Sequence, residues 1–269
     1  MIRRVATPVL LAVSLSFVAA TPAAGQQSVT GDASLSAALA APTRTPANIA
    51  RDKYRNPGPT LAFFGVQPNH NVVELWPGGG WYTEILAPYV NASGNLSVVP
   101  PAGQYDERIR AKLTSDPAYG KVTVATFKAG QPTAIASGSA DVVLTFRNVH
   151  SWLGGDEPIA GQVFAEAFRM LKPGGVFGVV EHRLPESASD ERQKSSGYVK
   201  VSTVRQLAEQ AGFKLAAASE INANPKDTAD WPDGVWTLPP SLRIKDKDRE
   251  KYLAIGESDR MTLKFIKPQ

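Results

Sequence analysis

Short apolar runs alternate with amphipathic segments from residue 71 to the end of the chain. Four of the amphipathic segments have the apolar spacing of a helix: residues 82–90, 105–115, 160–171 and 202–212. Strands that are continuously apolar and separated by helices predict a mainly parallel sheet, covered by helices on both faces. The apolar runs predict strands at residues 71–76, 95–99, 121–127, 140–146, 175–182, 214–220 and 261–267.

Two other segments do not follow this alternation of strands and helices. Residues 26–70 are rich in Ala, Ser, Thr and Pro and predict a helical lead-in, which proline and glycine break up from residue 55 onward. Residues 221–242 are rich in Asn, Pro, Asp and Trp, and this stretch either folds over a binding site as a lid or packs as a surface loop. Residues 71–269 are then expected to form one α/β domain. Further helices are expected at residues 35–42, 46–54 and 243–256.

The N-terminus has the pattern of a secretory signal peptide. Arg3 and Arg4 precede an apolar stretch at residues 9–20, and small residues follow at 23–25. The apolar stretch is too short to span a bilayer. We therefore expect residues 1–25 to be removed during export, which leaves a periplasmic protein without a stable membrane anchor.

The composition narrows the possible functions. The chain has no cysteine, which excludes disulfides, thiolate metal ligands and a cysteine nucleophile. Its net charge is +4, and its Lys and Arg residues are scattered rather than interleaved with aromatics. Nucleic-acid binding is therefore not expected, and a small-molecule ligand is the more natural partner. The composition does not indicate an oligomeric state.

The stretch "VVELWPGGGWYTEIL" (residues 72–86) places a glycine-rich loop between a strand and a helix. Such a loop lets a ligand approach the backbone and the start of the helix. It is neither the G-x-G-x-x-G fingerprint, because Thr83 takes the last position, nor a P-loop, because no Gly-Lys-Ser/Thr follows. Two interpretations remain: a ligand-binding loop, or a tight turn that only packs the strand on the helix.

Three stretches in this order resemble a known family: "VVELWPGGG" (72–80), "ADVVLTFRNVH" (140–150) and "FAEAFRMLKPGGVFGVVEH" (164–182). Residues 71–220 resemble a class I S-adenosylmethionine-dependent methyltransferase, in an exported branch. The resemblance implies a Rossmann-like, seven-stranded and mostly parallel sheet with an antiparallel last strand. It also implies S-adenosylmethionine as the cofactor and methyl transfer to a small acceptor.

In that family the glycine loop lies under the amino-acid part and the ribose of the cofactor. The chain departs from the family in two places. Trp76 stands where a first glycine is usual, and Pro100 stands where an acid usually binds the ribose hydroxyls, with no acid before Asp106. By resemblance, the cofactor-binding residues are Glu74, Trp76, Pro77, Gly78, Gly79, Gly80 and Arg147.

Polar residues follow strands four and five, where ligands of open parallel sheets bind. Asn148, His150, Glu181 and His182 are the candidates for orienting or deprotonating an acceptor, and the histidines titrate near neutral pH. The alternative is that these side chains only shape the surrounding loops. We expect no metal site, because neighbouring side chains on a strand such as Glu181 and His182 point to opposite faces.

A binding protein that has lost the cofactor is the main alternative to a methyltransferase. Pro100 favours it, and so does the expected export, because S-adenosylmethionine is a cytosolic metabolite. A different enzyme that uses the histidines is a third possibility.

Overall fold

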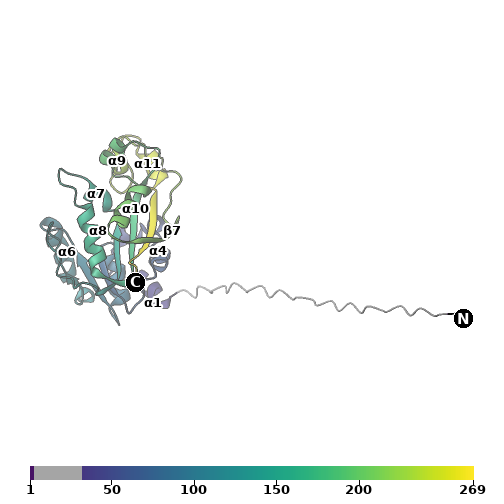
Figure 1. Cartoon of the computed structure of the whole chain (residues 1–269). Coiled ribbons are helices and arrows are strands. Elements are labelled where there is room, and N and C mark those ends of the chain that lie inside the picture. Colours follow the sequence, from purple (N-terminus) through teal and green to yellow (C-terminus); the bar gives the residue numbers. More distant parts are fainter. Residues whose placement is uncertain (3–31) are drawn as a thin grey trace. The chain divides into compact units, whose positions relative to one another are not determined.

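A mixed sheet forms the centre of the protein (Figure 1). The computed structural model describes residues 1–2 and 32–269, and residues 32–269 form one compact unit. Nearly all of the predicted signal peptide, residues 1–25, lies outside the described residues, so it stays a prediction. Within residues 32–269, the helices are too short or too polar to cross a membrane.

The strand order is β3-β2-β1-β4-β5-β8-β7, and a short strand, β6, also pairs with β5. All pairs are parallel except those of β8, which is antiparallel to both β5 and β7. The predicted fold class, including the antiparallel last strand, is confirmed. The strands are β1 (Asn71–Leu75), β2 (Asn95–Val99), β3 (Thr123–Val124), β4 (Ala140–Phe146), β5 (Leu171–Leu184), β6 (Val199–Lys200), β7 (Lys214–Ser219) and β8 (Arg260–Ile266).

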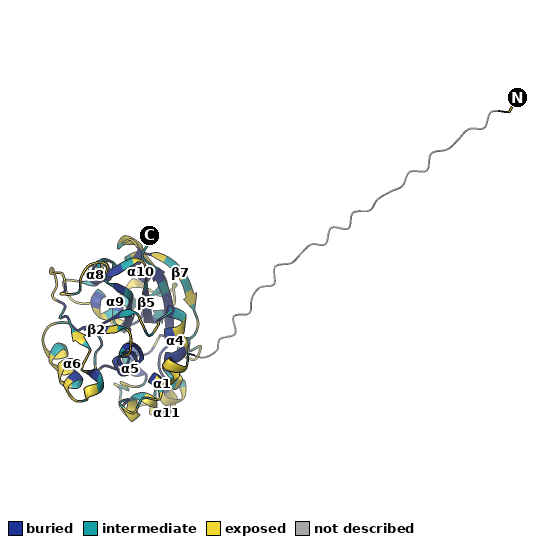
Figure 2. Cartoon of the chain, turned by 90° about the horizontal axis from the view of Figure 1, so that it is seen from below, coloured by how far each residue is buried: buried dark blue, intermediate teal, exposed yellow. Residues whose placement is uncertain are grey.

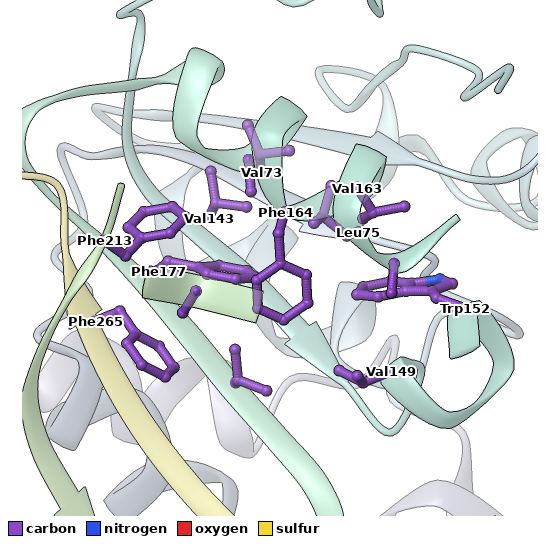
Figure 3. Packing of buried hydrophobic residues seen from close by; sticks show 14 of the residues in the cluster. Val73, Leu75, Val143, Val149, Trp152, Val163, Phe164, Phe177, Phe213 and Phe265 are labelled. Carbon is purple, nitrogen blue, oxygen red and sulfur yellow. The ribbon is translucent and has the colours of Figure 1, made fainter. Parts of the chain in front are cut away.

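Helices cover both faces of the sheet, and each face has its own apolar core. Alternation along β1 sends Val73 to one core and Val72 to the other. Figure 3 shows the first core, in which Phe164 and Phe177 meet edge to face with ring centroids 5.2 Å apart. The helices are α1 (Ala33–Leu39), α2 (Pro46–Ile49), α3 (Asp52–Arg55), α4 (Pro57–Phe64), α5 (Thr83–Val90), α6 (Gln104–Thr114), α7 (Val149–Leu153), α8 (Ala160–Met170), α9 (Asp190–Ser196), α10 (Val201–Gln210) and α11 (Arg249–Ile255).

The lead-in helices belong to the same compact unit as the sheet. Helix α1 packs on α5, whose residues are buried except for Pro88, and Figure 2 shows α5 almost wholly dark blue. A helix that is apolar on all sides needs such a second cover. The lead-in is thus an integral layer of the fold, and it brings its own polar side chains close to the sheet.

Three sequence-based boundaries were wrong. Helix α4 forms in the segment that proline and glycine were expected to break up, because its prolines stand in the first turn, where their missing N–H is not needed. The charged helix expected at residues 243–256 is reduced to α11. The fifth strand, expected at residues 175–182, begins already at Leu171, directly after α8, and ends at Leu184.

Candidate functional site

A cavity of about 520 Å³ lies at the carboxyl ends of β1, β4 and β5. Segments after β1 and β4 form its floor, and His182 near the end of β5 also lines it. The lead-in contributes side chains from α2 and α3. The wall is completed by Arg260 at the start of β8 and by Val235, Trp236, Pro239, Pro240 and Ser241. Part of the segment that sequence analysis considered as a lid thus borders the site.

The glycine loop after β1 has an unusual backbone. Gly78 and Gly80 have φ of +59° and +79°, and Trp76 has φ of +48°. A Cβ added at Gly78 would meet no atom within 4 Å, whereas one at Gly80 would lie 2.7 Å from a side-chain carbon of Lys112. Gly78 therefore leaves open space beside the cavity that it lines, and Gly80 allows α6 to pack on the loop.

Trp76 and Gly78 also line a second cavity of about 250 Å³. The indole ring of Trp76 packs edge-on against Trp152, and its buried N–H has no hydrogen-bond partner among the described residues. The side chains around this second cavity include no carboxylate within the described chain; its lining residues are Trp76, Gly78, Pro101, Tyr105, Asn148 and Ser151. Asp106, the first acid after β2, is bonded to Arg110 and Thr126 instead.

Glu74 lies apart from the other predicted cofactor-binding residues. Its carboxyl group is buried and accepts a hydrogen bond of 2.6 Å from the hydroxyl of Thr83 at the start of α5. Burial raises the pKa of Glu74 to about 7. Among the residues described around the two cavities Glu74 is absent, whereas Pro77, Gly79 and Arg147 line the larger one. The structure thus places Glu74 at the junction of β1 and α5.

Glu181 and His182, which were expected to point apart, lie near the end of β5 and come close to His150, which follows β4. The carboxylate of Glu181 accepts backbone N–H groups from Val149 and His182, at 2.5 and 2.8 Å, and lies 3.0 Å from Nδ1 of His150. Potential metal-ligand atoms of His150, Glu181 and His182 all lie within 4.8 Å of one another. Contrary to the prediction, strand alternation does not keep the ligand atoms of Glu181 and His182 apart, because the Glu181 carboxylate folds back onto the backbone of its own strand.

The surroundings of this trio disfavour a cation. Nδ1 of His182 lies 2.5 Å from the hydroxyl of Ser258, and burial together with the neighbouring His150, Arg260 and Arg147 holds the pKa of His182 well below the usual range. Positive groups that keep an imidazole neutral also repel a metal ion. The absence of a metal stays a prediction.

Asn148 holds the two strand ends together. Its side-chain amide donates to the carbonyls of Leu75 and Trp76, both at 3.2 Å, and to the hydroxyl of Thr145 at 3.0 Å. The amide nitrogen is therefore engaged with the protein, and Asn148 positions the glycine loop relative to β4.

The lead-in and β8 bring charged side chains to the cavity that were not predicted from the sequence. Glu257 pairs with Arg51 at 2.5 Å and Arg55 at 3.3 Å, and it also pairs with Arg260. Arg51 and Glu257 are 206 positions apart in the chain, so no local pattern marks them. The single available signal was the charge of Arg260 at the start of an apolar strand.

Comparisons with known proteins agree with this architecture. Residues 73–179 match the sequence model of a family described as methyltransferase domain. No curated protein gives a significant match. Among solved structures, an S-adenosylmethionine-dependent methyltransferase from Aquifex aeolicus superposes with a TM-score of 0.56 at 14% identity, covering 81% of this chain and 93% of its own.

Two further structures show how widely the fold is used. The [4+2]-cyclase SpnF superposes with a TM-score of 0.54 at 14% identity, over 80% of both chains. Phosphoethanolamine N-methyltransferase 2 of Haemonchus contortus, in complex with S-adenosyl-L-methionine, has a TM-score of 0.52 at 17% identity; 80% of this chain and 53% of that chain are covered. The chain therefore has the fold of these methyltransferases, and its residues 73–179 match the methyltransferase-domain family.

The residues around the loop fit S-adenosylmethionine in part. The open space at Gly78, the unpartnered indole N–H of Trp76 and the cationic Arg147 suit the amino-acid part of the cofactor. A carboxylate for the ribose hydroxyls is lacking among the described residues of the second cavity, where Tyr105, Asn148 and Ser151 offer uncharged polar groups. A charged hydrogen bond contributes about 1.5–3 kcal/mol, so a cofactor held here would bind more weakly by about that amount than one whose ribose meets a carboxylate.

Proposed function

We propose that the protein transfers the methyl group of S-adenosylmethionine to a small acceptor held in the larger cavity. The observation that carries the proposal is that the glycine loop and the His150–Glu181 pair line or adjoin one cavity, at the strand ends of a methyltransferase domain. Ligands of open parallel sheets bind in this place. A cofactor on the loop and an acceptor beside His150 would therefore meet within one enclosed space.

When bound, S-adenosylmethionine supplies a methyl group on a positively charged sulfur that leaves as a neutral thioether. Gly78 and Gly79 let the backbone come close to the amino-acid part, and Arg147 pairs with its carboxylate. Trp236 also lines the cavity, with its ring centroid 6.1 Å from that of His150, and excludes water beside the imidazole.

His150 is the proposed general base. Because Glu181 also accepts backbone N–H groups, it acts as a carboxylate, and Nδ1 of His150 is the atom that donates to it. Nε2 is then the unprotonated nitrogen, and it takes the proton that the acceptor loses on methylation. Glu181 stabilises the imidazolium that results, as the carboxylate does in a histidine–carboxylate pair of a hydrolase.

Calorimetric titration with S-adenosylmethionine, and separately with S-adenosylhomocysteine, tests the cofactor assignment. We expect micromolar binding that is lost in Gly78→Val, because the added side chain enters the open space beside the loop. Gly138→Val is the matched control, because Gly138 has φ of +63° and an added Cβ there also meets no atom within 4 Å. Gly138 lies just before β4, at the opposite end of that strand from the cavity. No heat and no thermal shift at millimolar ligand would refute the proposed function.

A non-catalytic protein that binds another small ligand on the same fold remains the second candidate. The observation that favours it is the carboxylate-free second cavity beside Pro101. We also propose that the chain is exported to the periplasm, where S-adenosylmethionine is not made. Mass spectrometry of the protein from cells tests export, since removal of residues 1–25 leaves an N-terminus at Gln26.

A further inference from the structure

Positive charge dominates the walls of the larger cavity. Glu84 is the single carboxylate residue described among its lining residues, and it is already paired with Lys112 at 2.6 Å. Glu257 is not among the lining residues, and its carboxylate forms ion pairs with three arginines. The cationic residues that line the cavity are Arg51, Arg55, Arg108, Lys112, Arg147 and Arg260.

Two of these arginines are buried and incompletely bonded. Arg55 and Arg260 are each 2% exposed. Nη2 of Arg55 and Nε of Arg260 are buried without a hydrogen-bond partner among the described residues, as is Nη2 of Arg51. A buried donor that loses its water without gaining a partner costs about 1–3 kcal/mol, and more when it is charged. Their unsatisfied donors therefore indicate a missing acceptor.

Arg147 adds a further charge in an unusual backbone setting. It follows β4 directly with φ of +63°, and its backbone N–H donates to the carbonyl of Val180 at 2.7 Å. A side chain other than Gly, Asn or Asp is uncommon in this conformation. Burial and the positive charge of Arg260 lower the pKa of Arg147 to about 10, and no ion pair of its guanidinium is found within residues 32–269.

We propose that Arg55, Arg147 and Arg260 bind a phosphate-type oxyanion group of the methyl acceptor; the acceptor role rests on the proposed function, whereas the anion site does not. Guanidinium groups donate two parallel hydrogen bonds to such groups. A doubly charged group with several acceptor oxygens satisfies the unbonded N–H groups and offsets the surplus positive charge.

The cofactor alone does not remove this surplus. Its single carboxylate is opposed by its own ammonium and sulfonium groups, so S-adenosylmethionine brings net positive charge into an already cationic cavity. An anionic acceptor compensates both the arginines and the sulfonium. The predicted substrate class is therefore a small phosphorylated molecule, with free inorganic phosphate as its simplest mimic.

Titration of the purified chain with inorganic phosphate at constant ionic strength tests the site. We expect thermal stabilisation and binding by the wild-type protein, and binding at least about tenfold weaker in Arg147→Asn and in Arg260→Gln, since each removes a charge-assisted contact. Asparagine suits the backbone of residue 147, so that variant keeps its fold even if Arg260→Gln does not. Arg205→Gln removes an exposed arginine on α10, paired with Glu209 at 3.7 Å, and is expected to bind phosphate as the wild type does.

The outcomes separate the two proposals. No phosphate binding, or equal binding by Arg147→Asn, overturns the anion site. Phosphate that competes with S-adenosylmethionine overturns the acceptor assignment, because the anion would then occupy the place of the cofactor's own carboxylate rather than a place beside it. Phosphate that leaves cofactor affinity unchanged or improves it supports the assignment. Phosphate binding without any S-adenosylmethionine binding refutes the methyltransferase and the acceptor role while the anion site stands.

Discussion

Glu74→Gln is expected to stabilise the protein at alkaline pH and to have little effect in acid. Glu74 is 2% exposed, and one hydrogen bond from Thr83 is the contact its carboxyl group makes among the described residues. Burial raises its pKa from 4.5 to about 7. At about 1.36 kcal/mol per pKa unit, ionised Glu74 costs the folded state about 3 kcal/mol.

The pH window follows from the direction of this pKa change. Between pH 4.5 and 7 the folded protein keeps a proton that the unfolded chain has released, so the free energy of unfolding falls as pH rises through this range. The cost is absent below pH 4.5 and complete above pH 7. Glutamine has no charge to bury and keeps an oxygen that accepts from Thr83, although its amide hydrogens lack partners.

Urea denaturation of the wild type and Glu74→Gln at pH 4.5, 6, 7 and 8.5 measures the effect. The variant's advantage should grow from near zero to about 2–3 kcal/mol across the series. The exposed Glu107→Gln serves as the control and should show no such trend. A difference independent of pH would refute the burial argument. Loss of S-adenosylmethionine binding in a well-folded Glu74→Gln would instead show that the carboxylate acts on the cofactor.

Three further predictions concern other parts of the molecule. Glu257→Gln should destabilise the protein by about 3–5 kcal/mol in urea at pH 7, because it leaves buried arginines without their shared carboxylate. Despite burial, those arginines lower the pKa of Glu257 from 4.5 to about 2, so the stability it contributes is present above pH 4.5 and lost as pH falls toward 2. His150→Gln should reduce methyl transfer by about 10²–10⁴-fold and leave the calorimetric affinity for S-adenosylmethionine unchanged, whereas a drop in affinity alone would contradict its role as base. Gly178→Ala should lower thermal stability by about 1–3 kcal/mol, because its Cβ would lie 2.7 Å from Leu144 and 2.8 Å from Phe64, while Gly161→Ala in α8 meets no atom within 4 Å and should not destabilise.

The sheet was predictable because its central strands are covered on both faces. The apolar runs of β1, β2 and β4 coincide with the observed strands to within one residue. Helix α4 was missed because a proline-rich sequence describes both a broken segment and a helix with its prolines in the first turn. Strand β6 is two residues long and has no pattern of its own.

The candidate site was predictable only where the sheet itself positions the side chains. Chain order and the rule that ligands bind at the carboxyl ends of parallel strands predicted His150 and Glu181 to be neighbours. Nδ1 of His150 and Oε1 of Glu181 lie 3.0 Å apart. Strand alternation predicts only the direction in which a side chain leaves the backbone, so the folding back of the Glu181 carboxylate onto the backbone of β5 was not foreseen. The arginines around Glu257 could not be predicted from any local pattern. Arg51 and Arg260 lie far apart in the chain and meet Glu257 only in the folded protein.

The residues that line the larger cavity come from two parts of the chain, and each part is expected to affect ligand binding differently. The glycine loop, Arg147 and His150 lie within the part that matches the methyltransferase domain, residues 73–179. Arg55 and Arg260 lie outside it, in α3 and at the start of β8. Changes in the first group should therefore alter cofactor binding or chemistry, and changes in the second should alter the preference for anionic ligands at unchanged cofactor affinity. Arg147 is the one residue that belongs to both sets, and its variants alone should affect cofactor and anion binding together.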